Sequence, residues 1–396
     1  MKPPVSRARW LQETRKMRFE EVYTDWQEKR LTQAEAARLL GVCERTFRRQ
    51  MGRYEADGLD GLIDKRIEQI SHRRAPVDEV VKLVELYRRD YAGWNVRHFH
   101  CWYRREHAGQ RSYTWVKNQL QQAGEVKRAK ARGKHRKKRE RAPLPGMLVH
   151  QDASRHEWVA GHDWDLVVTL DDATGEHLSM FFCEEEGTAS SFHGVGQTIA
   201  CHGLFCALYT DRGSHYFHTP EAGGKVDHNN PTQFGRALAQ LGIEHIAAYS
   251  PEARGRSERA FGTHQERLPR ELAKADITDM QQANAYLQQV YMPRHNAEFA
   301  VPAAESGSAF VPYIGNGLAD ILCEHHERTV GNDNCVSFER LKLQIPADSA
   351  RPHYVKRRVR VHRYVDGTLA VFYGPRCLGR YDAQGALVSA PVQLAA

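Results

Sequence analysis

Three acidic residues carry the strongest chemical signal in the sequence: Asp152, Asp211 and Glu258. The aspartates end the apolar segments MLVHQD and LFCALYTD, and Glu258 lies in YSPEARGRSERAFG. Fifty-eight residues separate the aspartates, and 46 separate Asp211 from Glu258. Three carboxylates brought together repel one another unless they share cations, and Mg²⁺ prefers hard oxygen ligands. The set therefore indicates two-metal chemistry, in which ions about 4 Å apart act on the attacking and leaving oxygens of a phosphodiester.

The segments around these carboxylates predict an α/β layer that would position them. Strands are expected at 147–152, 164–172, 177–185, 204–211 and 243–250, and helices at 188–203, at 231–242 and from 251 onward. Three hairpin-linked strands followed by alternating helices and strands give one mixed sheet. Asp152 and Asp211 end the first and fourth strands, so they converge with Glu258 if those two strands are neighbours.

Three arginines, Arg254, Arg256 and Arg259, closely flank Glu258. A solvated helix start with ion pairs at helical spacing would explain them. If Glu258 is instead a metal ligand, the arginines would contact a DNA backbone. At 100° per residue Gln265 shares the face of Glu258, whereas Arg256 and Arg259 lie on roughly the opposite face.

Other carboxylates compete for the metal-ligand roles. Asp171 and Asp172 are near Asp152 in the expected sheet, but DDATG is a hairpin turn, where aspartate is common for backbone reasons. Asp163 and Asp165, beside a tryptophan, are weaker candidates.

Several cationic or titratable side chains near the triad each allow two interpretations. Arg212, like Arg259, would contact phosphate or only balance charge. His215 and His264 would shuttle protons or serve as structural histidines. The polar, turn-rich stretch 219–231 is expected to be a mobile loop that orders on DNA.

The basic charge of the chain is concentrated in one segment. The whole chain has a net charge of +8, and residues 125–141 alone carry ten Lys/Arg against two Glu. Such a segment, including Arg136, Lys137 and Lys138, indicates a polyanion partner and gives salt-sensitive, sequence-independent affinity. A disordered linker is the compatible alternative.

Residues 31–53 have the pattern of a helix-turn-helix. Thr32 and Glu35 form a capping box, Gly41 ends the first helix, and Phe47 lies on the inner side of the second. Ala36, Leu39 and Leu40 are expected to form the apolar face of the first helix. The residues expected to meet the major groove are Arg45, Thr46, Arg48 and Arg49.

A second helix-turn-helix is expected in residues 76–124. Val80, Val81, Leu83, Val84 and Tyr87 follow the helical period, and Ser112 caps a helix in which Lys117 is a candidate DNA contact. His98, His100, Cys101 and His107 fit no common zinc spacing. The eight cysteines include no CxxC pair, which favours reduced buried thiols over disulfides or a structural zinc site.

The C-terminal segment alternates with a period of two around Asp366-Gly367, a hairpin signal. A small β-barrel is expected there, with Arg358, Arg360 and His362 on a basic face. Before it, residues 277–296 form an amphipathic helix ending near Asn296, which is either part of a family motif or a capping residue.

Residues 147–299 resemble the integrase-type, ribonuclease-H-like core of bacterial insertion-sequence transposases, most closely the ISNCY group. The motifs that carry the resemblance are VHQDAS, LYTDRGSHY, SPEARGRSERAFGTHQERL and PRHNAEF, and the resemblance extends over about nine-tenths of the chain. It implies that Asp152, Asp211 and Glu258 are the catalytic and metal-binding triad. It also implies two Mg²⁺ ions per site, with Mn²⁺ as a substitute.

The activity implied is a Mg-dependent DNA transposase and endonuclease. Such a protein binds the terminal inverted repeats, cuts the element ends with water and joins the 3′-hydroxyl to target DNA. Its partners would be double-stranded DNA and further copies of itself, as a dimer or higher homo-oligomer. Two alternatives stay open: a catalytically inactive DNA-binding regulator, and a metal-dependent nuclease without strand transfer.

The expected fold is multidomain, with tandem helical units, a ribonuclease-H-like core with a mixed five-stranded sheet, and a small barrel. The domain ranges are 1–70 and 71–124 for the helix-turn-helix units, 125–146 for the basic linker, 147–300 for the core, 301–333 for a bridge and 334–396 for the barrel. No apolar run approaches the roughly 20 residues of a membrane helix, and the N-terminal residues lack a secretory pattern. A cytoplasmic, nucleoid-associated bacterial protein is therefore expected.

Overall fold

The computed structural model describes residues 7–64, 75–128, 140–221, 224–227, 229–249, 251–347 and 351–389, without the side chains of 7–9 and 251–254. The chain divides into two compact units, Met1–Leu86 and Tyr87–Ala396. The division falls inside helix α4 (Val77–Asp90). The expected boundary near residue 70 lies outside the described residues.

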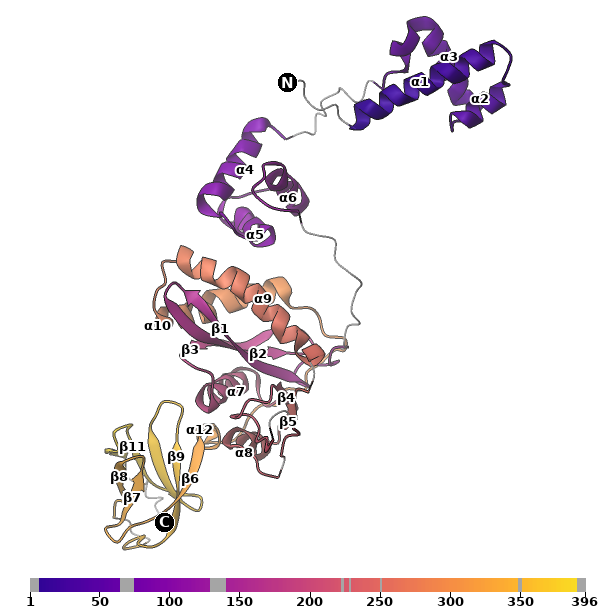
Figure 1. Cartoon of the computed structure of the whole chain (residues 1–396). Helices are drawn as coiled ribbons and strands as arrows, with labels where there is room; N and C mark the ends of the chain where they lie inside the picture. The colour runs from indigo at the N-terminus through magenta and orange to yellow at the C-terminus, as the bar shows by residue number, and fades with distance from the viewer. Residues whose placement is uncertain are drawn as a thin grey trace. The chain divides into compact units, whose positions relative to one another are not determined.

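The first unit contains the helix-turn-helix (Figure 1). Its elements are α1 (Arg7–Gln27), α2 (Gln33–Leu39), α3 (Glu44–Asp57) and the 3₁₀ helix η1 (Gly58–Leu62). The predicted capping box is confirmed: the Glu35 N–H donates to Thr32 Oγ1 at 3.3 Å, and the Thr32 N–H donates to Glu35 Oε2 at 2.8 Å. Gly41 ends α2 with φ of 70°.

The core of this unit depends on α1, a helix that was not predicted from the sequence. Phe19 and Tyr23 of α1 pack with Ala36 and Phe47, and all four are buried. Leu39, expected on the buried face of α2, is 47% exposed, so that assignment was wrong. The helical period alone cannot fix the buried face, since α1 decides which side of α2 is covered.

Three helices follow: α4, α5 (Val96–Glu106) and α6 (Tyr113–Gln122). Ser112 caps α6 as predicted, accepting a hydrogen bond from the Trp115 N–H at 3.3 Å. Helix α5 was not predicted. Phe99 of α5 packs on Tyr91 with ring centroids 5.1 Å apart, and Trp94, which precedes the helix, packs on the same ring at 4.9 Å.

The central element is the predicted mixed five-stranded sheet, in the order β3-β2-β1-β4-β5. Strands β1 (Val149–Val159), β2 (His162–Asp171) and β3 (His177–Cys183) are antiparallel, whereas β4 (Ala207–Thr210) and β5 (Glu244–Ala247) run parallel to β1. Helices α7 (Thr188–His202) and α8 (Gln233–Gln240) pack against one face of this sheet, and α9 (Pro251–Lys274) and α10 (Met280–Tyr286) pack against the other (Figure 1).

Strand β1 is longer than predicted. The expected strand ended at Asp152, but β1 continues to Val159 because β2 pairs with it along this whole length. Strand β4 pairs with β1 only at Val149 and His150. Asp152 therefore lies within β1, close to the point where its second neighbour ends.

Two asparagine side chains form hydrogen bonds with backbone groups on the outer edge of β3. The helix after α10 passes through a π-helical turn (Leu287–Tyr291) into α11 (Met292–Phe299). Asn296 accepts from the His177 N–H and donates to the His177 carbonyl, both at 2.9 Å. Asn284 makes the same pair of bonds to Phe182, at 2.6 and 3.0 Å. Asn296 is thus an edge-strand partner rather than a capping residue.

Replacing Asn296 with alanine is expected to lower the free energy of unfolding by about 1–3 kcal/mol, because it leaves the N–H and carbonyl of His177 unsatisfied. Urea denaturation measures this loss. Gln282→Ala is the control, since Gln282 is exposed on the neighbouring helix. An equal effect of both substitutions would contradict the edge role.

The predicted C-terminal barrel is not confirmed, because the sheets formed by the described residues are not closed. Strands β6 (Glu324–Thr329), β9 (Arg358–Arg363), β10 (Leu369–Tyr373), β11 (Arg376–Tyr381) and β12 (Leu387–Ser389) form one sheet in the order β12-β11-β10-β9-β6. Strands β7 (Cys335–Phe338) and β8 (Leu341–Gln344) form a separate pair, and a short helix α12 (Leu318–Ile321) precedes β6.

The hairpin at Asp366-Gly367 is confirmed, with β9 and β10 antiparallel on either side and φ of 83° at Gly367. The predicted basic face is only partly present. Arg358 and Arg360 are exposed, but His362 is 4% exposed and faces the interior.

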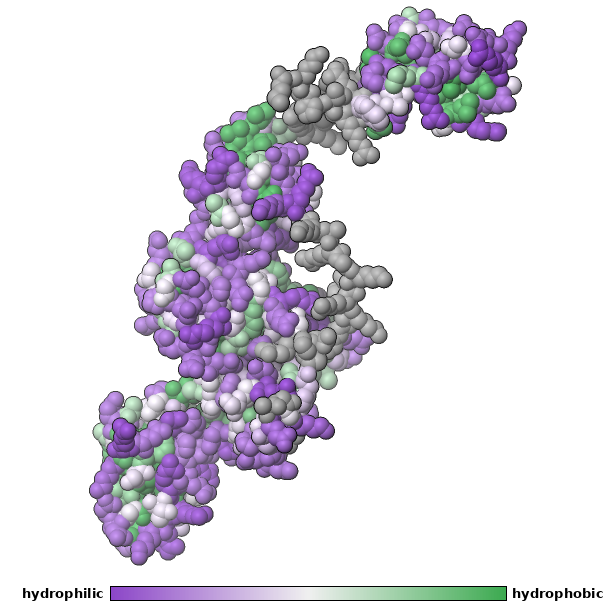
Figure 2. Space-filling model, in the orientation of Figure 1, coloured by the Kyte–Doolittle hydropathy of each residue, from purple (hydrophilic) through white to green (hydrophobic). Residues whose placement is uncertain are grey.

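Hydrophilic side chains cover most of the visible surface, with scattered hydrophobic patches (Figure 2). Among the described residues, no helix combines the length and the apolar character that a membrane crossing requires.

Candidate active site

The strand register brings Asp152 and Asp211 together. Val149 pairs with Leu208 and His150 with Tyr209 in the parallel β1–β4 ladder. Continuing this register by two residues sets Asp152 opposite Asp211, at the spacing of neighbouring strands, about 4.8 Å. The condition on which the sequence prediction depended, that the first and fourth strands are neighbours, is met.

Both aspartates lie on the sheet face that α9 covers. Side chains alternate along a strand, so His150, Asp152 and Ser154 share one face. The rings of His150 and Tyr209 are 5.2 Å apart, which places residue 209 on this face too. Asp211 is two residues beyond Tyr209, just past the end of β4.

Backbone N–H groups orient the two carboxylates. Asp152 Oδ1 accepts from the Ala153 N–H at 3.1 Å. Asp211 Oδ1 accepts from the Gly213 N–H at 2.8 Å. Asp152 is 8% exposed, so its charge is held in a largely desolvated position beside a second carboxylate.

Helix α9 presents Glu258 on the same face of the sheet. Phe261 and Leu268 of this helix are buried against β1 and β2. Gln265 donates to Ser154 Oγ at 3.0 Å. Glu258 precedes Gln265 by seven residues, two helical turns, and so shares its face. Ser154 is two residues past Asp152 in β1. Followed from Gln265 back to Glu258, α9 runs along β1 in the direction of Asp152. Glu258 is therefore on the stretch of α9 nearest the aspartates, and it is exposed.

Arg256, a predicted DNA contact, makes internal contacts in the structure. Its guanidinium pairs with Asp172 and also donates to the Asp172 and Glu140 carbonyls, at 3.2 and 3.1 Å. Asp172 is 1% exposed and also binds His150 Nε2 at 2.7 Å. Arg256 is thus an internal ion-pair partner that joins α9 to the turn after β2.

The same turn anchors the end of the basic segment. The Ala142 N–H donates to Asp172 Oδ2 at 2.7 Å, and Arg141 donates to the Asp172 and Ala173 carbonyls, both at 3.1 Å. Asp171 binds the Gly146 and Thr174 N–H groups, both at 2.8 Å. Asp171 therefore binds backbone groups at the turn, whereas Asp172 also binds the side chains of His150 and Arg256. The described end of the basic segment lies beside the strand that carries Asp152.

The other predicted DNA-binding residues are distributed over both units. Arg45, Arg48, Arg49 and Arg259 are exposed, and Thr46 and Lys117 are half-buried. The remaining predicted contacts, namely Arg136, Lys137, Lys138 and the side chain of Arg254, lie outside the described residues. Arg259 Nε donates to the Gly255 carbonyl at 3.0 Å. Arg212 donates to the Gly224 carbonyl at 2.9 Å, in the described part of the loop expected at 219–231.

Two residues beside the aspartates were missed by the sequence reading. The buried Tyr216 hydroxyl lies 3.2 Å from Gln151 Oε1 and 3.3 Å from Glu186 Oε1. Burial raises the pKa of Tyr216 well above its usual value, and the charges of Glu186, Asp152 and Asp211 add to this rise. Glu186 is therefore a further carboxylate whose charge, like those of the two aspartates, acts on the Tyr216 hydroxyl. Its position before α7 carries no motif, so only the fold reveals it.

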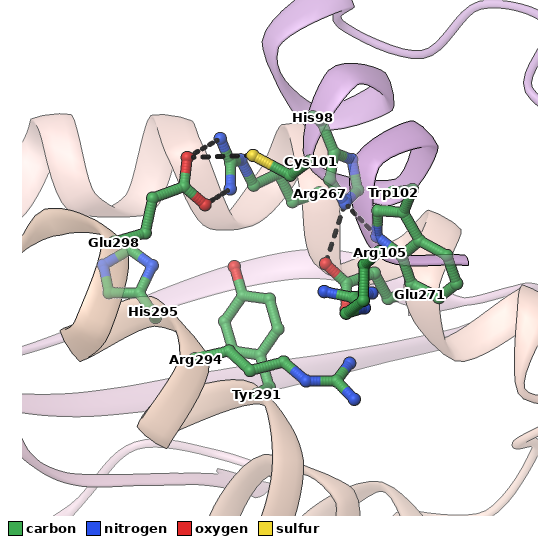
Figure 3. A pocket seen from close by; sticks show the side chains of 10 residues that line it. All are labelled: His98, Cys101, Trp102, Arg105, Arg267, Glu271, Tyr291, Arg294, His295 and Glu298. Carbon is green, nitrogen blue, oxygen red and sulfur yellow. Dashed lines mark hydrogen bonds and ion pairs between the residues drawn. The ribbon is translucent and has the colours of Figure 1, made fainter. Parts of the chain in front are cut away.

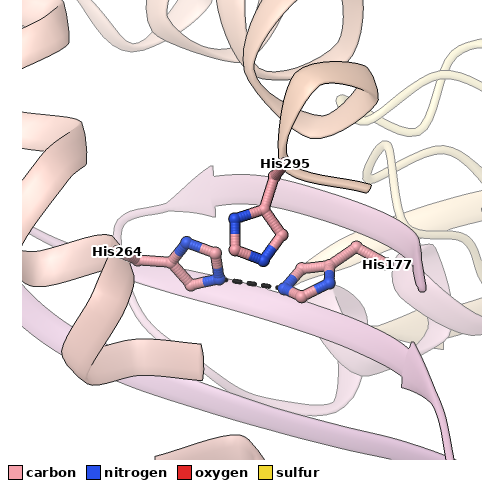
Figure 4. A group of neighbouring side chains, drawn as sticks. All are labelled: His177, His264 and His295. Atoms are coloured by element: carbon pink, nitrogen blue, oxygen red, sulfur yellow. Dashed lines mark hydrogen bonds between the residues drawn. The ribbon is translucent and has the colours of Figure 1, made fainter. Parts of the chain in front are cut away.

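His264 is unsuited to shuttling protons. It is completely buried with His177 and His295, and the three rings gather between β3, α9 and α11 (Figure 4). Burial lowers the pKa of His264 well below its usual value, and that of His177 to about 4. These histidines are neutral core residues at physiological pH.

Helix α5 packs against α9 and α11, and side chains from these helices line a small cavity (Figure 3). His98 Nε2 lies 2.8 Å from Glu271 Oε1, and the Cys101 thiol is 3.5 Å from Glu298. Arg267 pairs with Glu298 at 2.7 Å. The cavity that these side chains line is about 30 Å³, room for about two water molecules and too small for a nucleotide.

This docking also separates the residues considered as a zinc site. His100 bonds the Arg111 carbonyl at 3.0 Å, and His107 bonds the Tyr91 hydroxyl at 2.9 Å. His98 and Cys101 bind the different carboxylates described above. The four side chains therefore do not converge.

The donor set fits divalent magnesium. Two carboxylates side by side on one face, with a third on the facing helix, provide the hard oxygen ligands that Mg²⁺ prefers. Without a cation, the like charges of Asp152 and Asp211 would oppose each other in a poorly solvated position.

The chain is similar in sequence to a family model and to transposases. Residues 24–79 match the family model described as "Winged helix-turn helix". The chain is 32% identical over 355 residues to the protein named "Putative transposase y4bF" of Sinorhizobium fredii, covering 86% of this chain and 75% of the relative. It is 30% identical over 222 residues to the transposase for insertion sequence IS1202 of Streptococcus pneumoniae, covering 56% of this chain and 47% of that protein.

Among solved structures, the trimeric HTLV-2 integrase catalytic core domain in complex with magnesium is similar. It has 18% identity and a TM-score of 0.30, and the match covers 38% of this chain and 90% of that domain.

Proposed function

The chain belongs to the insertion-sequence transposases, and from this premise we propose that it binds the terminal inverted repeats of its element, cleaves at the element ends and joins the freed 3′-hydroxyl to target DNA. The observation that supports the proposal is the β1–β4 register, which, continued by two residues, would set Asp152 opposite Asp211 on the sheet face that α9 covers. The assembly that acts on paired ends would be a dimer or higher oligomer of this chain.

In this proposal Asp152, Asp211 and Glu258 hold two Mg²⁺ ions, for which Mn²⁺ can substitute. When bound, the ions supply charge stabilisation to the phosphate undergoing in-line transfer. The protein supplies the geometry: the Ala153 and Gly213 N–H groups orient the aspartates, and packing of Phe261 fixes α9. Preorganised charge and positioning account for most of the rate gain in such reactions.

DNA recognition is divided between helix α3 and less specific basic contacts. The exposed Arg45, Arg48 and Arg49 of α3 would enter the major groove. Arg259 and Lys117 would contact phosphates, as would the basic segment around Lys137.

Replacing Arg48 with alanine should weaken binding of the element ends by about 1–3 kcal/mol if it reads a base. If it contacts only phosphate, the salt dependence of binding should fall by about one unit. Fluorescence anisotropy at several salt concentrations distinguishes the two results. Arg30→Ala is the charge-matched control, because Arg30 pairs with Asp25 and Glu28 in the same unit. Equal losses in both variants would contradict a groove contact.

The proposed activity is tested with purified protein, Mg²⁺ and labelled DNA from the flanks of the gene. Nicking at the repeat end followed by joining to a plasmid is the expected result. Cutting without joining would identify a nuclease. Binding without cutting in either Mg²⁺ or Mn²⁺ would identify a regulator that lacks catalysis.

A further inference from the structure

Three ligand-type side chains meet where the C-terminal sheet contacts the core: Cys323, His325 and His362. His325 of β6 is the direct antiparallel partner of His362 of β9. Cys323 precedes His325 by two residues. One potential ligand atom from each lies within 4.8 Å of the others, and Cys323 and His362 are buried, at 0% and 4% exposed.

The ring nitrogens of His362 are unsatisfied within the part of the chain that the structure describes. Both Nδ1 and Nε2 are buried without a hydrogen bond among the described residues. The ring is held between His325 and Phe372, stacked on them at 4.0 and 4.1 Å. Leaving buried polar atoms unsatisfied costs about 1–3 kcal/mol for each group. Such an atom in a native fold requires an explanation, and a bound ion is one.

The hydrogen bonding of His325 suits a metal ligand. Its Nε2 lies 2.9 Å from the Asp320 carbonyl, which accepts the N–H and leaves the lone pair on Nδ1. Histidines that bind metals usually donate their second ring N–H in this way, which fixes the tautomer. The Cys323 thiol lies 3.3 Å from the same carbonyl.

We propose that Cys323, His325 and His362 bind one zinc(II) ion that fastens the C-terminal sheet to the core. One thiolate and two neutral imidazoles are the donors that zinc takes, at tetrahedral sites with room for a fourth ligand such as water. Mg²⁺, which prefers oxygen donors, would not compete. On binding, the Cys323 thiol gives its proton to solvent and sulfur donates its electron pair to the metal. No redox change is involved.

The location gives the ion a structural effect. Gln233 of α8 donates to the His325 carbonyl at 2.8 Å and accepts from the His325 N–H at 2.9 Å. Arg236 of α8 also donates to the Ile321 carbonyl at 3.2 Å. The ion would therefore link β9 to the segment that α8 already holds, and its binding energy would add to the stability of this junction.

The ring nitrogens of the three-histidine group in Figure 4 are hydrogen-bonded differently from those of His362. His177 Nε2 lies 2.9 Å from His264 Nε2, and His264 Nδ1 lies 3.0 Å from the Tyr291 hydroxyl. His177 Nδ1 is 3.3 Å from the Gly175 carbonyl. These bonds satisfy His177 and His264 without an ion, so a neutral hydrogen-bonded core explains that group.

Cobalt(II) titration of the full-length protein, freed of metal with a chelator and kept in Mg²⁺, tests the proposal. One equivalent should produce thiolate-to-cobalt charge-transfer absorption, and zinc(II) should abolish it. Cys323→Ser should remove the band, and His362→Gln should weaken cobalt binding at least about tenfold. Cys377→Ser, which changes a half-buried cysteine of the same sheet outside the cluster, should leave the band unchanged.

Absence of the band in the wild type would overturn the proposal, as would its persistence in folded Cys323→Ser protein. Cobalt bound without a charge-transfer band would place the ion at histidines or carboxylates elsewhere, which also overturns it. Circular dichroism verifies folding of each variant, and the wild-type band gives a result even if one variant fails to fold.

Discussion

Replacing Glu258 with glutamine should lower the rates of end cleavage and of strand joining at least about a thousandfold, while leaving DNA affinity unchanged. The amide keeps the size of the side chain but removes the charge that completes the proposed ligand set. Losing metal-based charge stabilisation of about 4 kcal/mol corresponds to this factor, at 1.36 kcal/mol per tenfold change in rate. Single-turnover assays on labelled element ends measure both steps.

Glu266→Gln is the matched control for this prediction. Glu266 lies on the same helix, is exposed, and accepts a hydrogen bond from Asn95 at 3.1 Å. It is about two turns beyond Glu258 and away from the aspartates. The control variant should cut and join at the wild-type rate. If Glu258→Gln retained wild-type rates, Glu258 would not be the third ligand, and Glu186 would be the next carboxylate to examine.

Replacing Arg256 with alanine should destabilise the unit formed by residues 87–396 by about 3 kcal/mol, because it leaves the buried Asp172 carboxylate without its arginine. The effect should appear as a lower midpoint in urea denaturation. Asp172 keeps its bonds to His150 and to the Ala142 N–H, so the loss should fall toward the lower end of the range for broken buried pairs.

Arg259→Ala separates stability from DNA binding. Arg259 lies three residues from Arg256 but is exposed, and its described hydrogen bond is to the carbonyl of its own helix. Its replacement should leave the denaturation midpoint within about 0.5 kcal/mol of the wild type and reduce DNA affinity at low salt. If replacing Arg256 reduced DNA affinity without lowering the denaturation midpoint, the internal role of Arg256 would be contradicted.

Local signals in the sequence predicted those parts of the fold that depend on local interactions. The Thr32–Glu35 capping box, the Ser112 cap and the hairpin at Asp366-Gly367 are each fixed by residues a few positions apart. Features that depend on distant partners were missed or wrong. The full length of β1 follows from its pairing with β2, and Leu39 is exposed because α1 covers the other side of α2.

The candidate site shows the same difference between features set by local sequence and features set by distant partners. Asp152 and Asp211 could be named because each ends an apolar segment of the sequence, but their adjacency depends on the β1–β4 register. The charge of Arg256 predicts a DNA contact, but its pairing with Asp172, 84 residues away, is not visible in the sequence. Cys323, His325 and His362 have no recognised zinc spacing, and only the β6–β9 pairing brings them together.

The most direct test of the central claim is the rate of end nicking by Asp152→Cys in Mg²⁺ and in Mn²⁺. A thiolate is a poor ligand for Mg²⁺, whereas Mn²⁺ accepts it more readily. If Asp152 touches the metal, the variant should be inactive in Mg²⁺ and regain measurable nicking in Mn²⁺, while the wild type is active in both. Equal activity of the variant in both ions would show that Asp152 is not a metal ligand and would contradict the account.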